Sequence, residues 1–298
     1  MVILRANKEF LNNYYLYYVL KSEKIQQQIN NVRTGSAQPQ FPISHMVKLE
    51  INIPDLQTQH NIASTLLTLD EKIMINENIN HHLEQVAQAI FKSWFVDFKP
   101  WGGVMPDDWQ EVTLNKIANI TMGQSPDGES YNEDGIGIVF YQGRAEFGSR
   151  FPTRRLFTTE PKRMAKMNDV LLSVRAPVGD INVAYESCCI GRGLAAIQSK
   201  YKFQSFILYT LYSLKQHLSM FNGEGTVFGS INKNDMENLP VVLPPDKEIQ
   251  KFEELIHPMD EIIEYNFLEC CNLATLRDTL LPRLMSGELR VSGIESAK

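Results

Sequence analysis

Two stretches that share one register decide the fold: residues 69–90, LDEKIMINENINHHLEQVAQAI, and residues 259–280, MDEIIEYNFLECCNLATLRDTL. Shifting the numbering by 190 pairs identical or similar residues along both stretches: Asp70 with Asp260, Glu71 with Glu261, Ile73 with Ile263, Asn76 with Asn266, Leu83 with Leu273 and Ile90 with Leu280. A segment that occurs twice in one chain indicates one supersecondary unit present in two copies.

The similarity extends on both sides, so that the copies span roughly residues 14–98 and 206–284. Each begins with a helical stretch, in which Tyr15-Leu16-Tyr17 parallels Ile207-Leu208-Tyr209, and continues through a loop that contains Gly35 or Gly225. Residues 49–53 and 239–243 then carry apolar residues at every second position and end at a proline. This alternation predicts a short, half-buried edge strand in each copy, ahead of a long helix.

The long helices carry a stripe of residues spaced alternately by four and three, which is the pattern of a coiled-coil seam. A polar Asn at one matched position of both helices is the kind of residue that fixes register at a cost in stability. An ordinary amphipathic helix on a globular core is the alternative. We expect two helices of about 28 to 30 residues that pair as an antiparallel coiled coil through Leu69, Ile73, Asn76, Leu83, Ile90, Met259, Ile263, Asn266, Leu273 and Leu280.

A different block lies between the copies. Proline and glycine punctuate residues 100–106, which indicates entry into a new domain, and short apolar runs follow at 109–114, 136–141, 169–174, 181–185, 188–190 and 194–197. These runs predict strands with loops between them, and Asn115 is expected to cap a short helix that ends near Thr121. The predicted class is α+β, with a mixed α/β domain flanked by the two helical repeats.

The charge of this block differs from that of the whole chain. The 298 residues carry a formal net charge of −6, which excludes a globally basic nucleic-acid binder. Residues 144–175, however, hold eight basic residues against three acidic ones, and six of the eight are arginines. Arginine can bind phosphates and can also bond a guanine edge with two hydrogen bonds. A solvated charged face or a protein-binding surface is the alternative interpretation.

We expect the DNA contacts, if this block binds DNA, among its cations and a few neutral polar side chains. The candidates are Arg144, Arg150, Arg154, Arg155, Lys162, Arg163, Arg175, Arg192, Gln124, Tyr141, Gln142 and Asn182. Which of them touch bases and which touch phosphates cannot be read from the sequence.

Several catalytic and membrane interpretations find little support. Residues 221–225 have a Phe-x-Gly-x-Gly form seen in S-adenosylmethionine-dependent methyltransferases, but a helical stretch rather than a strand leads into them. Asp127, Glu160 and Lys162 are too loosely spaced for a nuclease metal site, and the cysteines form two adjacent pairs rather than spaced metal ligands. No run of 18 apolar residues is present, so we expect a cytoplasmic protein without catalytic residues, metal or cofactor of its own.

Both copies and the block between them resemble a known family, the specificity subunits of Type I restriction-modification systems. The segments 35–39, 53–59 and 87–98 are very similar to the central conserved region of that family. Residues 169–179 with 189–194 resemble one class of its target-recognition domains, and residues 281–289 resemble its distal conserved region.

The resemblance implies a set of domains and partners. Residues 1–55 would be the remnant of a first recognition domain with the start of a conserved region, 56–99 a spacer helix, 104–245 a target-recognition domain with its variable core at 104–200, 246–284 a second spacer helix and 285–298 a tail. The implied partners are double-stranded DNA, methyltransferase subunits and a motor-nuclease subunit, with S-adenosylmethionine, ATP and Mg²⁺ used by those subunits.

One departure from the family keeps other hypotheses open. Family members begin with a complete first recognition domain, whereas this sequence starts near the end of one, which suggests a truncated or recombined gene, or a half-subunit that forms a two-fold homodimer. An interaction module that binds methyltransferase without specific DNA binding is one alternative. A self-sufficient nuclease or methyltransferase is another.

Overall fold

The structure, a computed structural model, describes residues 3–32, 41–223 and 229–291. The chain divides into two compact units, residues 1–79 with 265–298 (unit 1) and residues 80–264 (unit 2). The repeat glycines Gly35 and Gly225 lie outside the described residues. In the described part of the chain, no helix is both long and apolar enough to cross a membrane.

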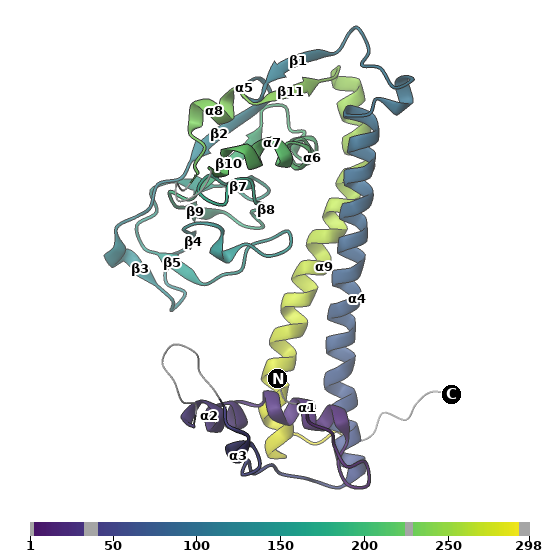
Figure 1. Ribbon diagram of the computed structural model, residues 1–298, viewed down its shortest axis with the longest axis vertical. Helices are drawn as coiled ribbons and strands as arrows, with labels where there is room; N and C mark the ends of the chain where they lie inside the picture. Colours follow the sequence, from purple (N-terminus) through teal and green to yellow (C-terminus); the bar gives the residue numbers. More distant parts are fainter. Residues whose placement is uncertain (1–2, 33–40, 224–228, 292–298) are drawn as a thin grey trace. The chain divides into compact units, whose positions relative to one another are not determined.

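Two helices run through both units (Figure 1). They are α4 (Leu56–Phe95) and α9 (Asp246–Ser286), 40 and 41 residues long, which is longer than the 28 to 30 residues expected. Both begin where the sequence predicts a helix start, at residues 56 and 246. At the first of them the carboxylate of Asp55 accepts the Thr58 N–H at 2.9 Å, as a helix cap does.

In unit 1, α1 (Asn13–Lys21), α2 (Glu23–Asn31) and α3 (Ile43–Met46) accompany the adjoining parts of α4 and α9. The Asn12 side chain caps α1 by accepting two backbone N–H groups. The core of this unit contains Tyr15, Tyr18, Leu66 and Leu284, all nearly inaccessible to solvent.

The two long helices are antiparallel, as predicted. In unit 1 Asp70 contacts Arg277 and Asn76 contacts Glu269, so that numbers rise along α4 as they fall along α9. In unit 2 the amide of Asn80 donates to the Ile263 carbonyl at 2.9 Å, which continues the same order.

The expected seam residues are buried or half-buried, as residues on the inner face of two paired helices would be. Asn76 is fully buried, and its Nδ2 donates to Glu269 Oε2 at 2.6 Å. Its Oδ1 has no hydrogen-bond partner among the described residues. A buried polar atom without a partner costs stability, as expected of a seam Asn that specifies register.

Unit 2 contains three small sheets. The first pairs β1 (Gln110–Thr113) with β11 (Pro240–Leu243). The second has the order β2-β10-β7-β8, and the third β3-β5-β4-β9-β6. Their strands are β2 (Ala118–Met122), β3 (Tyr131–Asn132), β4 (Ile138–Tyr141), β5 (Leu156–Thr158), β6 (Met164–Ala165), β7 (Val170–Ser173), β8 (Ile181–Val183), β9 (Cys188–Ile190) and β10 (Leu194–Ser199).

Short helices complete unit 2: α5 (Leu114–Ile117), α6 (Gln204–Ser213), α7 (Lys215–Ser219) and α8 (Lys233–Glu237), with 3₁₀ turns η1 (Lys99–Trp101), η2 (Gly128–Ser130), η3 (Arg144–Glu146) and η4 (Met220–Asn222). All strands pair antiparallel except β4 with β9. All four residues of β7 are buried, as in a strand covered on both faces.

Three sequence expectations about local structure are wrong. Residues 49–53 form no strand, because nothing among the described residues pairs with them, whereas the matching segment β11 has β1 as its partner. Asn115 does not cap the short helix but lies within it, since α5 begins at Leu114; the helix ends at Ile117, because residues 118–122 form β2 against β10. In α1 the inward tyrosine that matches Tyr209 is Tyr18 rather than Tyr17, which is 46% exposed.

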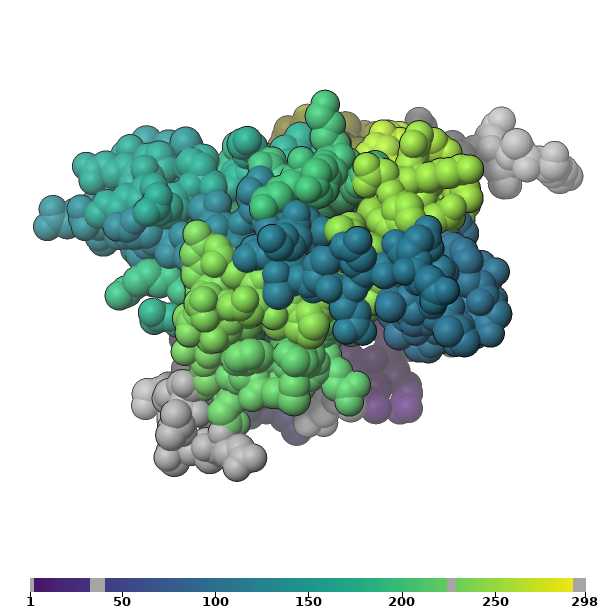
Figure 2. All heavy atoms as spheres, turned by 90° about the horizontal axis from the view of Figure 1, so that it is seen from above, coloured from purple at the N-terminus to yellow at the C-terminus, as the bar shows by residue number. Residues whose placement is uncertain are grey.

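Blue and yellow-green parts of the chain lie side by side on the face that Figure 2 shows. An aromatic cluster joins the end of α4 to the start of α9. Phe95 of α4 lies 5.3 Å from Phe252 of α9 and 5.7 Å from Trp109, measured between ring centroids. Trp109 directly precedes β1, so the same cluster fixes where the chain enters that strand.

The stability of unit 2 is expected to depend on pH through Glu253 of α9. Burial raises the pKa of its carboxyl to about 7 from an ordinary 4.5. Because the folded state binds this proton more tightly than the unfolded chain, the contribution of Glu253 is complete below pH 4.5 and is lost as the pH rises through 7. Glu253→Gln keeps an acceptor for the Phe206 N–H, which now lies 2.7 Å away, and does not ionise.

Urea unfolding at pH 5 and pH 8 tests this. Glu253→Gln should raise the free energy of unfolding by about 1–3 kcal/mol at pH 8 and much less at pH 5. The exposed neighbour Glu254→Gln is the control and should change neither value. An equal gain from both variants would show that general charge, not Glu253, is responsible.

Candidate nucleic-acid interface

Four loops of unit 2 meet at one place, although they are far apart in the sequence. They are residues 123–125 after β2, 142–144 after β4, 174–176 after β7 and 191–193 between β9 and β10. Backbone hydrogen bonds join them: Gln124 N to Ile190 O at 3.0 Å, Gly191 N to Tyr141 O at 2.8 Å, Gly193 N to Gln142 O at 3.2 Å and Val174 N to Gly193 O at 2.9 Å. We call these four segments the loop cluster.

Glycines allow the loops to approach this closely. A Cβ atom at Gly191 would lie 2.8 Å from both the Cα and the carbonyl oxygen of Gln142, closer than real Cβ atoms approach backbone. At Gly123 an added Cβ would collide with the carbonyl of Gly191. The obstacle in both cases is backbone, which cannot rotate away, so these glycines hold the loop cluster together.

The loop cluster presents exposed polar side chains from each loop: Gln124, Gln142, Arg175 and Arg192. Among the described residues, no carboxylate lies within ion-pair distance of Arg175 or Arg192. Glutamine can both donate to and accept from an adenine edge, and arginine can bond guanine or a phosphate. The sequence named all four as candidates, and the fold brings them together.

The other exposed cations differ in their partners. Arg144 belongs to the loop cluster but pairs with Asp180, and Arg155 pairs with Glu146. Arg154 forms a two-bonded pair with Glu186 at 2.6 and 2.8 Å, and Lys162 lies 3.1 Å from Asp127. Arg163 is exposed and has no ion-pair partner in the described part of the chain.

These acids reduce the positive charge that the sequence indicated. Asp127, Asp180 and Glu186 lie outside residues 144–175 in sequence, and the fold brings them to the cations inside it. The cationic surface is therefore smaller than a count along the chain suggests, and among the candidate contacts that the structure describes, the exposed cations without an ion-pair partner are Arg163, Arg175 and Arg192.

Three predicted contacts lie in the interior, which corrects their assignment as surface contacts. Tyr141 and Asn182 are each 1% exposed and Arg150 is 5% exposed. The Asn182 side chain bonds the backbone of Gly148 through both its oxygen and its nitrogen, each at 3.1 Å. Tyr141 follows the apolar run of β4 into the core. Apolar neighbours in sequence were the available signal for both.

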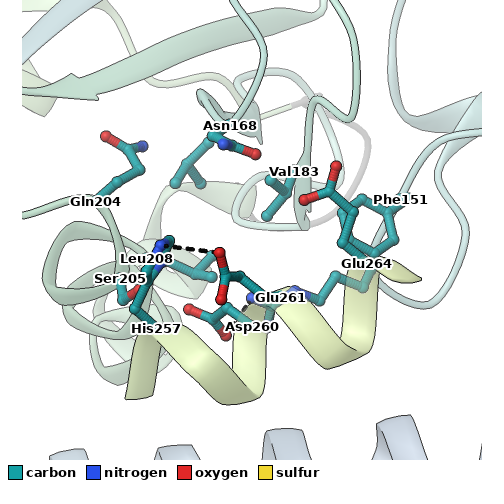
Figure 3. A pocket seen from close by; sticks show the side chains of 12 residues that line it. Phe151, Asn168, Val183, Gln204, Ser205, Leu208, His257, Asp260, Glu261 and Glu264 are labelled. Atoms are coloured by element: carbon teal, nitrogen blue, oxygen red, sulfur yellow. Dashed lines mark hydrogen bonds and ion pairs between the residues drawn. The ribbon is translucent and has the colours of Figure 1, made fainter. Parts of the chain in front are cut away.

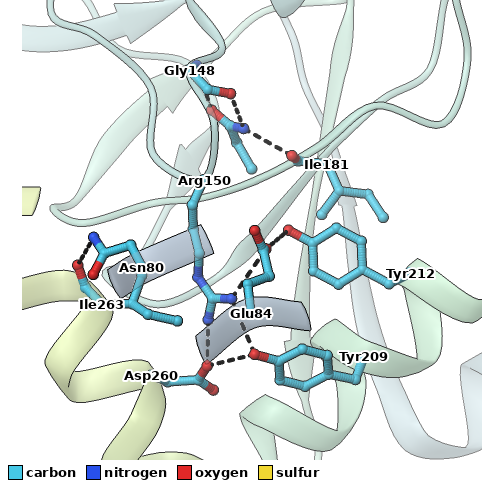
Figure 4. A network of polar contacts seen from close by, with 10 residues as sticks. Asn80, Glu84, Gly148, Arg150, Ile181, Tyr209, Tyr212, Asp260 and Ile263 are labelled. Atoms are coloured by element: carbon cyan, nitrogen blue, oxygen red, sulfur yellow. Dashed lines mark hydrogen bonds and ion pairs between the residues drawn. The ribbon is translucent and has the colours of Figure 1, made fainter. Parts of the chain in front are cut away.

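Arg150 instead contacts the long helices α4 and α9, for which the sequence predicts only a spacer role in this region. Its guanidinium reaches Asp260 of α9 at 2.6 Å, the Tyr209 hydroxyl at 3.2 Å and Glu84 of α4 at 3.4 Å (Figure 4). Burial is the largest single influence on the pKa of Arg150 and lowers it, but Asp260, Glu84 and the two tyrosines together raise the pKa above its ordinary value. Glu84, Tyr209 and Tyr212 were missed, because no local pattern marks them.

Within residues 3–32, 41–223 and 229–291, no three His, Cys, Asp or Glu side chains are grouped as metal ligands. A cavity of about 60 Å³ beside Arg150 is lined by Asp260, Glu261 and Glu264 of α9, and His257 there lies 3.5 Å from Glu261 (Figure 3). It has room for about two water molecules and none for a nucleotide.

Comparison with known proteins shows the family to which the chain is similar. The family model described as "Type I restriction modification DNA specificity domain" matches residues 1–85 and 106–266. A Methanocaldococcus jannaschii protein, named as the specificity subunit of the type I restriction enzyme MjaX, is 34% identical over 304 residues, which cover 98% of this chain and 71% of the relative.

Two solved structures are also similar. The HsdS subunit from Thermoanaerobacter tengcongensis is 30% identical over 96% of this chain and 73% of its own, with a TM-score of 0.48. The Type I restriction-modification S subunit from M. genitalium is 20% identical, covers 95% of this chain and 74% of its own, and has a TM-score of 0.57, which shows a shared fold. The family match, together with the 34% identity over nearly the whole chain, shows that this chain belongs to the family of Type I restriction-modification specificity subunits.

Proposed function

We propose that this chain recognises DNA for a Type I restriction-modification complex, reading one half-site through the loop cluster. The observation that carries the proposal is the convergence of Gln124, Gln142, Arg175 and Arg192, which arise from four separate loops and are all exposed. Side chains that combine amide and guanidinium groups on one rigid surface suit direct readout of base edges. Arg163 and the partly neutralised Arg154, Arg155 and Lys162 would add phosphate contacts.

In the same proposal the long helices bind the methyltransferase subunits. Several large apolar side chains of unit 1 are exposed on these helices: Ile75 is 49% and Ile79 41% exposed on α4, and Leu268 is 42% exposed on α9. Apolar groups exposed on a helix that already has one partner suit packing against further helices. A motor-nuclease subunit would join the same complex.

Catalysis belongs to the partners in this proposal. The chain itself would bind no cofactor, and S-adenosylmethionine, ATP and Mg²⁺ would be used by the methyltransferase and motor-nuclease subunits.

Removing the unpaired arginines tests DNA binding. Arg175→Gln and Arg192→Gln, in the chain assembled with its methyltransferase subunits, should each weaken binding to duplex DNA about tenfold and reduce the salt slope by about one. Fluorescence anisotropy across a salt series measures both quantities. Lys116→Gln makes the same change in charge at the opposite end of β2 and should have little effect. If all three variants bind alike, the loop cluster is not the DNA surface.

The glycine junction gives a second test of the same surface. Gly191→Ala should displace residues 142–144 and lower the free energy of unfolding by about 1–3 kcal/mol, and it should weaken DNA binding as well. Gly143→Ala is the matched control, because nothing lies within 4 Å of a Cβ built there and its φ of −166° suits alanine. Urea unfolding and anisotropy on both variants measure these effects, and equal behaviour of the two would contradict a close-packed junction.

Substitution of the exposed apolar residues tests methyltransferase docking. Ile75→Ser with Ile79→Ser should reduce co-purification with the methyltransferase subunits at least tenfold while helix content stays constant. Glu77→Ser lies on another face of α4 and serves as the control. If Ile75→Ser/Ile79→Ser co-purifies normally, the partners dock elsewhere. Retained docking without any DNA binding would favour the interaction-module hypothesis.

A further inference from the structure

Arg150 lies near the tip of a closed loop of the recognition domain, residues 147–152. The ends of this loop meet in an isolated β-bridge between Phe147 and Pro152, and Gly148 N donates to Phe151 O at 3.2 Å. The Asn182 side chain holds Gly148, and Val183 N donates to the Arg150 carbonyl at 2.8 Å. The backbone that carries Arg150 is therefore fixed by β8 and its neighbours.

The Arg150 side chain leaves this loop and ends between three helices. Besides Asp260 of α9 and Glu84 of α4, it meets Tyr209 of α6, whose hydroxyl donates to Asp260 at 2.8 Å. Tyr212 donates to Glu84 at 2.7 Å and closes the network. The side chain of Arg150 is only 6% exposed, so this contact is a built part of the interior (Figure 4).

The first repeat contains the same tyrosine–aspartate pair with a different source of positive charge. In unit 1 the Tyr18 hydroxyl donates to Asp70 at 2.6 Å, and Asp70 matches Asp260 in the repeat. The cation on Asp70 is Arg277, at 2.6 Å, and it comes from the opposite long helix. Unit 1 thus neutralises its aspartate within the helix pair.

The position that matches Arg277 in the other copy is Ala87, which is fully buried. The helix pair of unit 2 therefore lacks its own cation at this point. Arg150 supplies it from the recognition domain. A buried aspartate without a cation lowers the stability of the fold. The ion pair between Asp260 and Arg150 therefore joins the long helices to the loop that carries Arg150.

We propose that Arg150 is a positioning residue, which fixes the orientation of the recognition domain on the long helices and so sets where the loop cluster meets DNA relative to the methylated base. This inference rests on the proposed function of DNA recognition and adds a residue that touches no DNA. Several side chains from α4, α6 and α9 hold the guanidinium, so the orientation is restrained in more than one direction.

The test compares three double variants of the chain, each assembled with its methyltransferase subunits. Arg150→Gln/Asp260→Asn removes both charges of the closest ion pair, and Glu84 keeps the hydrogen bond from the Tyr212 hydroxyl. Arg277→Gln/Asp70→Asn makes the same change in unit 1 and is the matched control. Arg150→Ala/Ala87→Arg moves the cation from the loop to α4, which copies the arrangement of unit 1.

Two quantities are measured on target duplexes whose motif is first obtained by methylome sequencing with the unaltered chain. The first is the affinity for duplexes that contain the motif. The second is spacing discrimination, the ratio of methylation rates on the motif and on a version with one base pair inserted between the bases read by unit 2 and the methylated base.

Both variants that lack Arg150 should lose at least tenfold in spacing discrimination and stay within about threefold in affinity, because the loop cluster is unchanged. The control Arg277→Gln/Asp70→Asn should keep its discrimination, even if its thermal stability falls. Arg150→Ala/Ala87→Arg should regain thermal stability without regaining discrimination, which a purely structural role would not produce.

Full spacing discrimination in both Arg150 variants would overturn the proposal, as would an equal loss in the unit 1 control. If Arg150→Ala/Ala87→Arg fails to fold, Arg150→Gln/Asp260→Asn still decides the question. Failure of the unaltered chain to bind or direct methylation of any motif would instead contradict the proposed function, so the two failures are distinguishable.

Discussion

Two half-buried aspartates on opposite long helices, Asp70 and Asp260, each require a cation, and the way each obtains one organises its unit. Asp70 is 23% exposed and takes Arg277 from the facing helix. Asp260 is 13% exposed and takes Arg150 from a loop that lies far away in sequence. Because charge in a poorly solvated place must be paired, the two copies of one repeat acquire different roles. In unit 1 the ion pair lies within the two long helices, whereas in unit 2 it joins the long helices to a loop of the block between the repeats.

Elsewhere in unit 2, four loops come together with glycines rather than larger residues at the closest backbone approaches. Backbone hydrogen bonds and glycines at 123, 191 and 193 hold the loops together, and the exposed side chains beside these glycines remain free to face a ligand. Most other cations of the domain are paired with acids. The surface that can attract phosphate is consequently narrow and is centred on a few arginines, which suits a reader of sequence better than a general DNA clamp.

Much of the fold could be predicted from the sequence, because the repeat and the heptad spacing are local signals. The starts of α4 and α9 and their antiparallel pairing follow from them, and strands β4 and β7 to β10 follow from the short apolar runs between the repeats. The strand expected at 49–53 failed for want of a partner, which no local pattern reveals. Strands of two residues, such as β3 and β6, are too short for an alternating pattern to be recognised in the sequence.

The candidate site was only partly predictable. Gln124, Gln142, Arg175 and Arg192 were named from composition, but their convergence depends on strand order. Arg150 looked like its neighbours in sequence and proved to be buried, because its partners Glu84 and Asp260 lie 66 and 110 positions away. Because ion pairs between distant segments cannot be read from the sequence, a count of charges along the chain overestimates the number of unpaired cations.

The glycine junction also bears on how such a protein could change its target during evolution. The atoms that hold the loops together are backbone atoms, and they make the same hydrogen bonds whatever side chains stand at positions 124, 142 and 192. Substitutions at these three positions can therefore alter the chemical groups offered to a ligand while the framework beneath them persists. New preferences can arise by single exchanges, without an intermediate that fails to fold.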